Sequence, residues 1–458
     1  MRLTWAQPED LLAHELVQAA DEGVDVAAVR DRWVAAGGDP VPAVSGAGPV
    51  PAPPALRVLA RALLDELTDL RFAAPGAGAE PTEWDDLVAV LPPAPVLPPP
   101  PGRAALEARL LGAWTGRAAG CLLGKPVEKI PRQGIEEILR ATGRWPLDRY
   151  LTAVGLPDEV AARWPWNRRS APTSLEEVVD GMPEDDDLNY PLLALDLLER
   201  HGSALTTDDV ATAWLDALPA GRVFTAERAA LRNLLDARDV PATATHHNPF
   251  RWWIGALIRA DVHGWAHPGD VRAAARSALV DARLSHTGPG AQGAAWAAAL
   301  CAASLVLDDV EDVLDAAGAV LPPGGRLAAA VALGRRAGAS GGDLSAGLDT
   351  LHAALGRHHW VHVLPNAATV AFALAHGRGR FTPSVSAAVT AGWDTDSVGA
   401  TVGSVVGALR GLDGIEERWW RPLRGEVATS LPGPPTRSFA DLAARTALLS
   451  AATGRVGA

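Results

Sequence analysis

Apolar side chains recur at intervals of three and four residues through most of this chain, between turns rich in glycine and proline. This spacing predicts amphipathic helices. In the larger part of the chain we expect helices near 103–123, 133–141, 188–201, 207–217, 225–236, 250–263, 269–282, 290–307, 309–317, 326–337, 344–355, 365–375, 384–391, 396–410 and 438–453. Alternation with a period of two, which would indicate strands, is scarce. The pattern therefore predicts an all-α fold, a compact globule of many helices.

The first ninety residues carry two further helical patterns, at 9–35 and 55–72. They are followed by a segment with runs of two and four prolines, which can form neither helix nor sheet interior and acts as a stiff connector. We therefore divide the chain into three parts: a small helical N-terminal appendage at 1–90, a proline-rich linker at 91–102 and a main domain at 103–458.

Two of the predicted helices carry glycine at every fourth position. The glycines are Gly112, Gly116, Gly120 and Gly124 in one helix, and Gly399, Gly403, Gly407 and Gly411 in the other. Each costs roughly 0.5–1 kcal/mol relative to alanine, so close backbone packing has to offset the loss. We expect both helices in the core, where they could pack against each other. The alternative is that the glycines only reflect composition, since the chain holds 45.

Composition narrows the class of protein. With 48% hydrophobic and 21% charged residues the chain is globular, and a formal net charge of −13 argues against nucleic-acid binding. The longest apolar run, 294–307, is too short to span a bilayer, so we expect no membrane partner. The first ten residues contain no apolar core of a signal peptide. Two cysteines, Cys121 and Cys301, exclude a disulfide framework and suit the cytoplasm.

Two short acidic clusters carry the strongest chemical signal. The first cluster is Glu184, Asp185, Asp186 and Asp187, and the second is Asp394, Asp396 and Ser397; each opens a predicted helix. Adjacent carboxylates repel each other and are costly to bury, so two such clusters beside apolar helices suggest a shared site for cations. Oxygen ligands suit Mg²⁺, Mn²⁺ or Ca²⁺, and two ions could position a water. The competing interpretation is that the acids only cap helix N-termini.

Three other segments offer weaker signals. Glu128 follows a predicted helix end at Lys125-Pro126 and could point into a cleft, although it could equally lie on the surface. Aromatic residues and Arg259 in segment 248–261 could stack on a ligand or bind an anion, or simply lie in the core. Segment 284–293 could expose backbone N–H groups to phosphate. His358 and His362 have helical i, i+4 spacing but lack the glutamate of a zinc motif.

With these motifs in place, the chain resembles the ADP-ribosylglycohydrolases over roughly 106–425. The resemblance rests on Gly112-Ala113-Trp114-Thr115-Gly116-Arg117-Ala118-Ala119-Gly120, on Gly124-Lys125-Pro126-Val127-Glu128, on the acidic run, and on Gly392-Trp393-Asp394-Thr395-Asp396-Ser397-Val398-Gly399-Ala400. It implies an all-α globule with a centre of two Mg²⁺ ions, or Mn²⁺. It also implies hydrolysis of the bond between ADP-ribose and a protein or small molecule. The N-terminal appendage lies outside the core of the family.

The resemblance also implies roles for individual residues. The implied metal ligands are Glu184, Asp185, Asp186, Asp394, Asp396 and Ser397. The implied catalytic residues are Glu128, which corresponds to the glutamate near the reacting sugar, with Asp186 and Asp394. The implied ADP-ribose contacts are Gly255, Arg259, Ser285 and His286. Three positions depart from the family pattern: Glu184 and Asp187 replace hydroxyl residues, and Cys121 stands where many members have aspartate.

Three hypotheses follow from the sequence. The first is a metal-dependent glycohydrolase that removes ADP-ribose. The second, motivated by the altered first cluster, is a protein that binds ADP-ribose or a related nucleotide without cleaving it. The third is a structural helical protein whose acidic clusters are only helix caps.

Overall fold

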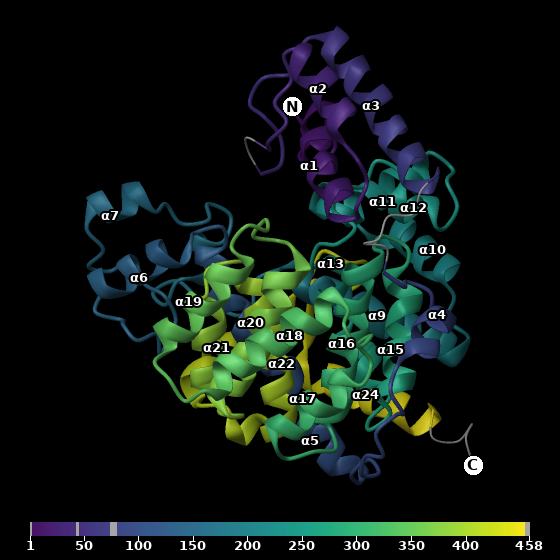
Figure 1. Ribbon diagram of the computed structural model, residues 1–458. Coiled ribbons are helices and arrows are strands. Elements are labelled where there is room, and N and C mark those ends of the chain that lie inside the picture. The colour runs from purple at the N-terminus through teal and green to yellow at the C-terminus, as the bar shows by residue number, and fades with distance from the viewer. Residues whose placement is uncertain (1, 43–44, 74–79, 454–458) are drawn as a thin grey trace.

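A computed structural model describes residues 2–42, 45–73 and 80–453 (Figure 1). Helices dominate, and the only strands among these residues form one short antiparallel pair, β1 Glu426–Ala428 and β2 Thr436–Ser438. The prediction of an all-α, many-helix globule is confirmed. Within the described residues, no helix combines the length and apolar character that crossing a bilayer would need.

The first three helices of the N-terminal appendage project from one end of the molecule, while its fourth helix lies along the side of the main domain (Figure 1). The appendage helices are α1 Pro8–Asp21, α2 Ala27–Ala35, α3 Pro54–Ala73 and α4 Trp84–Val90. The chain then runs without helix to Arg103, the first residue of α5. The division into appendage, linker and main domain stays a prediction, and the appendage is docked on the main domain by contacts described below.

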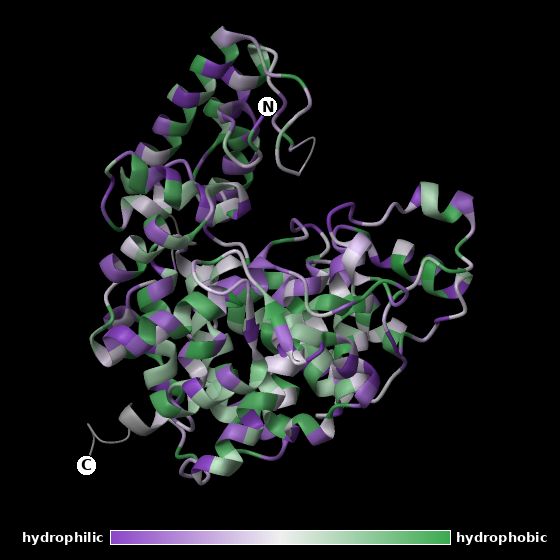
Figure 2. Ribbon diagram, turned by 180° about the vertical axis from the view of Figure 1, so that it is seen from behind, coloured by the Kyte–Doolittle hydropathy of each residue, from purple (hydrophilic) through white to green (hydrophobic). Residues whose placement is uncertain are grey.

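The main domain is a stack of helices around an apolar centre. Its helices are α5 Arg103–Gly124, α6 Arg132–Ala141, α7 Asp158–Arg163, α8 Ala171–Ser174, α9 Asp186–His201, α10 Thr207–Ala217, α11 Thr225–Leu235, α12 Ala242–Thr245, α13 Gly255–Ile258, α14 Asp261–Trp265, α15 Val271–Ala282, α16 Gly288–Ser304, α17 Val310–Gly318, α18 Arg326–Ala339, α19 Leu344–Leu355, α20 Val363–Gly377, α21 Phe381–Thr390, α22 Thr395–Arg410, α23 Glu417–Trp420 and α24 Phe439–Thr453. Hydrophobic residues concentrate among the central helices and hydrophilic ones on the outer helices (Figure 2).

One predicted helix is wrong. The expected helix at 250–263 is two short helices, α13 and α14, preceded by a non-helical segment. Backbone pairing with a distant loop holds that segment: Ile254 N donates to Val361 O at 3.0 Å, and Val363 N donates to Trp252 O at 3.0 Å. Long-range hydrogen bonds thus override the local helical pattern. The short helices α4, α7, α8, α12 and α23 and the strand pair were also not foreseen.

The two glycine-striped helices, α5 and α22, pack antiparallel against each other in the core. A methyl group at Gly120 would lie 1.9 Å from the carbonyl oxygen of Gly399, and one at Gly116 would lie 2.2 Å from that of Gly403. The expectation of two buried helices in backbone contact is confirmed. This packing sets the C-terminal end of α5 beside the N-terminal end of α22, where Thr395 Oγ1 donates to Gly124 O at 2.9 Å.

Candidate functional site

The functional site lies where the ends of three helices meet. The 3₁₀ turn η1 Lys125–Val127 leaves α5 and leads to Glu128, beside the start of α22. The N-terminus of α9 is brought to the same place by Arg117, a fully buried residue of α5. Its guanidinium donates to Asp187 O at 2.8 Å and to Asp261 Oδ2 at 2.7 Å. Both acidic clusters therefore face one region.

A cavity of about 790 Å³ opens over these helix ends, a size typical of small-molecule sites. It is lined by Thr4, Trp5, Ser45, Gly46, Lys125, Glu128, Lys129, Asn167, Arg169, Ser170, Thr173, Glu184, Asp185, Asp186, Asp187, Gly221, Arg222, Phe224, Thr225, Glu227, Ile254, Gly255, Ile258, Trp360, Val361, Asp394, Asp396 and Ser397. All residues of both acidic clusters are among them, so the sequence inference that the clusters converge agrees with the geometry.

The second cluster is joined by Glu128. Carboxylate oxygens of Glu128, Asp394 and Asp396 lie within 4.8 Å of one another. Burial, followed by repulsion from Asp396 and Glu128, raises the pKa of Asp394 well above its usual value. Burial, Glu128 and Asp185 raise the pKa of Asp396 to about 7. Three carboxylates thus meet here, and the surroundings of Asp394 and Asp396 favour the protonated form of each.

Helix capping explains only part of this arrangement. Asp185 is the N-cap of α9, and its Oδ1 accepts from Asp187 N at 2.9 Å. Asp394 occupies the N-cap position of α22, yet its side chain makes no capping hydrogen bond. The hypothesis that both clusters are only helix caps therefore does not account for Asp394.

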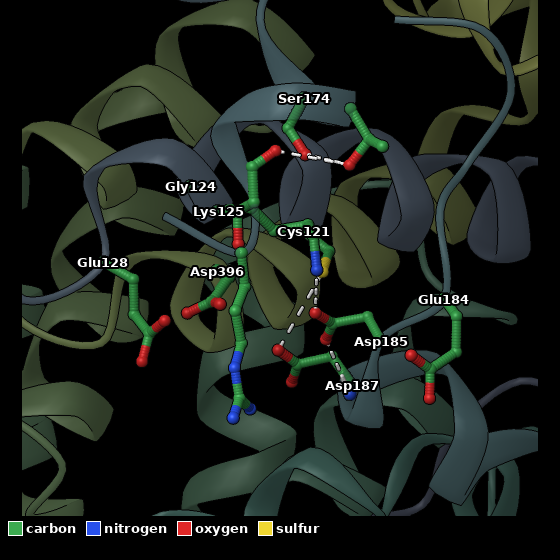
Figure 3. A network of polar contacts seen from close by, with 12 residues as sticks. Cys121, Gly124, Lys125, Glu128, Ser174, Glu184, Asp185, Asp187 and Asp396 are labelled. Atoms are coloured by element: carbon green, nitrogen blue, oxygen red, sulfur yellow. Dashed lines mark hydrogen bonds and ion pairs between the residues drawn. The ribbon is translucent and has the colours of Figure 1, made fainter. Parts of the chain in front are cut away.

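Lys125 supplies a positive charge inside the first cluster. Its ammonium pairs with Asp185, and both side chains are more than nine-tenths buried (Figure 3). Burial alone would raise the pKa of Asp185, but the Lys125 ammonium outweighs it and lowers the pKa. Asp186 has the opposite balance, since burial and then Asp185 and Asp396 raise its pKa well above the usual value. Lys125 therefore neutralises one carboxylate of the cluster and leaves the others.

Asp187 links the two clusters. Its Oδ2 accepts from Ser397 Oγ at 3.4 Å and lies 3.9 Å from Cys121 Sγ. Its Oδ1 is buried without a hydrogen-bond partner among the described residues and lies 3.7 Å from Arg117 Nη2. Burial and then Asp185 and Asp396 raise its pKa well above the usual value. Asp187, absent from our expected ligands, is a further candidate.

Glu184 is placed differently from the other acids. Its Oε1 accepts from Asn189 Nδ2 at 2.9 Å and from Ser430 Oγ at 2.8 Å, while its Oε2 pairs with Arg222. It lies on the far side of the cluster from Glu128 (Figure 3). Glu184 lines the cavity but already has polar partners that would compete with a metal ion.

Of the four expected ADP-ribose contacts, the structure brings one into the cavity. Gly255 lines it, whereas the side chains of Arg259, Ser285 and His286 are buried outside its lining. The Arg259 guanidinium is paired with Glu227 and Asp281, and its Nη2 donates to Ser285 Oγ at 3.1 Å. Our expectation that Arg259 meets a ligand anion is corrected, since two buried carboxylates already occupy its guanidinium.

Several cavity residues escaped the sequence analysis. The positively charged ones are Lys125, Lys129, Arg169 and Arg222, and the aromatic ones are Trp5, Phe224 and Trp360. One signal was available: the chain contains only two lysines, and both line this cavity. The aromatic and arginine residues gave no such signal, because neither type is confined to this part of the chain.

The site suits hard divalent cations. Its donors are carboxylate and hydroxyl oxygens, the ligands that Mg²⁺ and Mn²⁺ prefer. Among the described residues, no basic side chain forms an ion pair with Asp186, Asp394 or Asp396. Asp187 Oδ1 accepts no hydrogen bond among the described residues, although it lies 3.7 Å from Arg117 Nη2, and it adds a further candidate ligand oxygen. The residues present therefore fit a metal centre between the two clusters.

Comparison with known proteins assigns the family. The model of the ADP-ribosylglycohydrolase family matches residues 102–454, so the chain belongs to the ADP-ribosylglycohydrolases. A solved structure described as an ADP-ribosylglycohydrolase-related protein complex shares 22% identity and a TM-score of 0.48, covering 76% of this chain and 99% of that one. A search of curated proteins gave no match. The resemblance inferred from the motifs is confirmed, and membership implies a hydrolase of ADP-ribose linkages.

Proposed function

We propose that this protein is a metal-dependent hydrolase that cleaves the glycosidic bond between ADP-ribose and a modified side chain or small molecule. The observation that carries the proposal is the meeting of both acidic clusters and Glu128 in one cavity, with more carboxylates than neighbouring cations. A cavity of this size accommodates a nucleotide-sized ligand. Two buried free cysteines are consistent with the cytoplasmic location that we propose.

We propose Mg²⁺, with Mn²⁺ as the alternative, as the cofactor and two ions as the number bound. The ligands would come from Asp185, Asp186, Asp394, Asp396 and Ser397, with Asp187 added on the geometry described above. Glu184 would have to leave Arg222 and Ser430 to bind a metal, so we assign it an outer, orienting position. When bound, the ions supply positive charge for the ribose hydroxyls and the attacking water.

Glu128 is the proposed proton-transfer residue. Its carboxylate accepts a hydrogen bond from Asn167 Nδ2 and lies 3.3 Å from Lys129 Nζ, contacts that hold it at the cavity wall beside Asp394 and Asp396. In hydrolysis, the water oxygen bonds to the anomeric carbon as the glycosidic bond breaks. Glu128 takes a proton from the water and passes it to the leaving group, so that the elements of water are added across the broken bond and Glu128 is restored. Asp186, at the N-terminus of α9, and Asp394, at the N-terminus of α22, orient the water and the ribose.

Release of ADP-ribose from peptides carrying ADP-ribosyl-arginine or ADP-ribosyl-serine tests the proposal. We expect release with Mg²⁺, loss of release with EDTA, and recovery when Mg²⁺ is restored. Asp394→Asn keeps the size of the side chain and should abolish release, while Asp441→Asn, at an exposed site on α24, should not. Release that persists with EDTA or in Asp394→Asn would rule out the mechanism.

The binding-protein alternative is favoured by one observation. Lys125 places an ammonium directly on Asp185, and that charge competes with a cation for the same carboxylate. A site altered in this way could hold ADP-ribose without cleaving it. Calorimetry that shows Mg²⁺-dependent binding of ADP-ribose, with no cleavage of any substrate in the panel, would favour this alternative.

A further inference from the structure

The N-terminal appendage is held on the main domain by buried ion pairs. Arg251, fully buried in the main domain, reaches two glutamates of the appendage. Its Nη1 donates to Glu15 Oε2 at 2.8 Å and its Nε donates to Glu22 Oε1 at 2.6 Å. Breaking a buried pair leaves an uncompensated charge, which is strongly unfavourable. These contacts hold the appendage in one position rather than leaving it tethered by a linker.

An aromatic cluster continues this interface towards the cavity. The Trp5 ring lies edge-on to Phe250 and Trp253, with centroids 5.3 Å and 5.5 Å away. His359 stacks on Trp253 at 4.3 Å, and His14 of α1 packs edge-on against both rings. Trp5 is thus packed among several rings and is only 7% exposed, at a position that lines the cavity.

Two segments of the appendage form part of the cavity wall. Thr4 and Trp5 belong to one, Ser45 and Gly46 to the other. Thr4 is fixed by Arg228, whose Nη1 donates to both its carbonyl and its hydroxyl oxygen at 2.7 Å. The two segments therefore reach the cavity from the appendage and meet residues of the main domain there.

The second segment is fixed by residues of a loop that also lines the cavity. Ser45 Oγ accepts from Trp360 Nε1 at 3.1 Å and lies 3.0 Å from His359 Nε2. The cavity wall is thus built from both parts of the chain: the main domain contributes the carboxylates, and the appendage contributes one side.

The contacts along the cavity follow a chemical order. Glu128 lies beside Asp396 among the carboxylates and pairs with Lys129. The Lys129 ammonium lies 5.4 Å from the Trp360 ring centroid, and Trp360 bonds to Ser45 of the appendage. A path from carboxylates through a cation to aromatic rings matches the order of ribose, pyrophosphate and base in ADP-ribose.

A second group of residues joins the cavity wall to the appendage. The guanidinium groups of Arg169 and Arg228 both lie over the Phe224 ring, 5.8 Å and 5.3 Å from its centroid, and Arg228 donates to Thr4 of the appendage. Both Arg169 and Phe224 line the cavity. Lys129 and Arg169 therefore place two cationic side chains in the cavity wall, each over an aromatic ring.

We propose that the N-terminal appendage completes the ligand cavity and forms its base-binding end, where Trp5, Ser45 and the Ser45-bound Trp360 contact the nucleoside part of the substrate. This inference rests on the proposed function. It assigns the carboxylate end to the reacting ribose, the Lys129 and Arg169 cations to the pyrophosphate, and the appendage to the base. It makes the appendage a determinant of specificity for nucleotide-containing substrates.

The test compares two probes on the full-length protein with Mg²⁺. Calorimetry measures the binding of ADP-ribose, which spans the whole cavity, and of ribose 5-phosphate, which has no base. Trp5→Ala removes an aromatic surface whose stacking on a base contributes a factor of about ten in affinity. Ser45→Trp fills the base-binding end from an exposed position and leaves the rings of Trp5, Phe250 and Trp253 unaltered, although it removes the hydrogen bond from Trp360 Nε1. Val17→Ser, at a 53% exposed site on α1 outside the cavity, is the control.

We expect Trp5→Ala and Ser45→Trp to weaken ADP-ribose binding about tenfold or more and to leave ribose 5-phosphate binding and the control unchanged. ADP-ribose binding that is unchanged in Ser45→Trp would overturn the inference while the proposed function stands. Equal weakening of both probes would also overturn it, because the appendage would then not act at the base end. If the unaltered protein bound neither probe, the proposed function would fail as well.

Discussion

The contact between α5 and α22 allows one prediction to be worked through from the structure. Gly120→Ala adds a single methyl group in the middle of the interface. That methyl group would lie 1.9 Å from Gly399 O and 3.2 Å from Ala400 N. Both obstacles are backbone atoms, which cannot rotate away as a side chain can. The helices therefore have to separate, and the separation moves Glu128 relative to Asp394 and Asp396.

The magnitude follows from two opposing effects. Overpacking a core typically costs about 1–3 kcal/mol, and a backbone obstacle at this distance puts Gly120→Ala at or above the upper end. Alanine regains about 1 kcal/mol of helix propensity relative to glycine. The net loss in free energy of unfolding is therefore about 2 kcal/mol or more. For a chain of this size, that corresponds to a melting temperature lower by about 2 °C or more.

Thermal unfolding followed by circular dichroism, with a matched control, measures the effect. Gly318→Ala is the control, because Gly318 ends α17 and a methyl group there would meet no atom within 4 Å. We expect the control to be as stable as the unaltered protein or slightly more stable. The same samples, titrated with Mg²⁺, should show weaker metal binding in Gly120→Ala only. If Gly120→Ala unfolded at the same temperature as Gly318→Ala, the reasoning about backbone contact would be refuted.

Three further predictions concern the site. Glu128→Gln should lower the rate of ADP-ribose release about 100-fold or more while Mg²⁺ binding by calorimetry persists, and a rate within a few-fold of normal would exclude Glu128 as the proton-transfer group. Lys125→Met should lower the melting temperature without metal, because it leaves the Asp185 carboxylate buried and unpaired. Adding Mg²⁺ should raise the melting temperature of this variant by more than that of the unaltered protein. An equal rise in both proteins would contradict competition between Lys125 and the metal. Without metal, the carboxylates of Asp394 and Asp396 bind protons more tightly in the folded protein than in the unfolded one, because folding raises their pKa values. The melting temperature in EDTA should therefore fall as pH rises from about 4 to about 7, and it should fall less with Mg²⁺. A melting temperature that does not change with pH in EDTA would show that these pKa values are not raised.

The features that could be predicted from the sequence are those that depend on residues close together along the chain. Glycine at every fourth position identified α5 and α22 as closely packed helices, because only a bare helix face explains the repeated cost of glycine. The two acidic clusters stood out because carboxylates next to each other are unfavourable unless something neutralises them. Glu128 could be placed near them only through the family resemblance.

The parts that were missed depend on contacts between distant residues. The helical pattern around Arg259 does not show that Glu227 and Asp281 will occupy its guanidinium. The sequence beside Glu184 does not show that Arg222 and Ser430 will bind its carboxylate. Likewise, nothing local in the appendage indicates that its residues will line a cavity built by the main domain. These partners are selected by the tertiary fold rather than by spacing along the chain.

The account depends on a cation between the two acidic clusters. Anomalous diffraction from crystals soaked in Mn²⁺ tests this claim most directly, because Mn²⁺ accepts the same oxygen ligands as Mg²⁺ and can be located by its own signal. We predict anomalous peaks bonded to carboxylate oxygens of both Asp186 and Asp394. Crystals that bind Mn²⁺ elsewhere, or show no peak between these residues, would contradict the account.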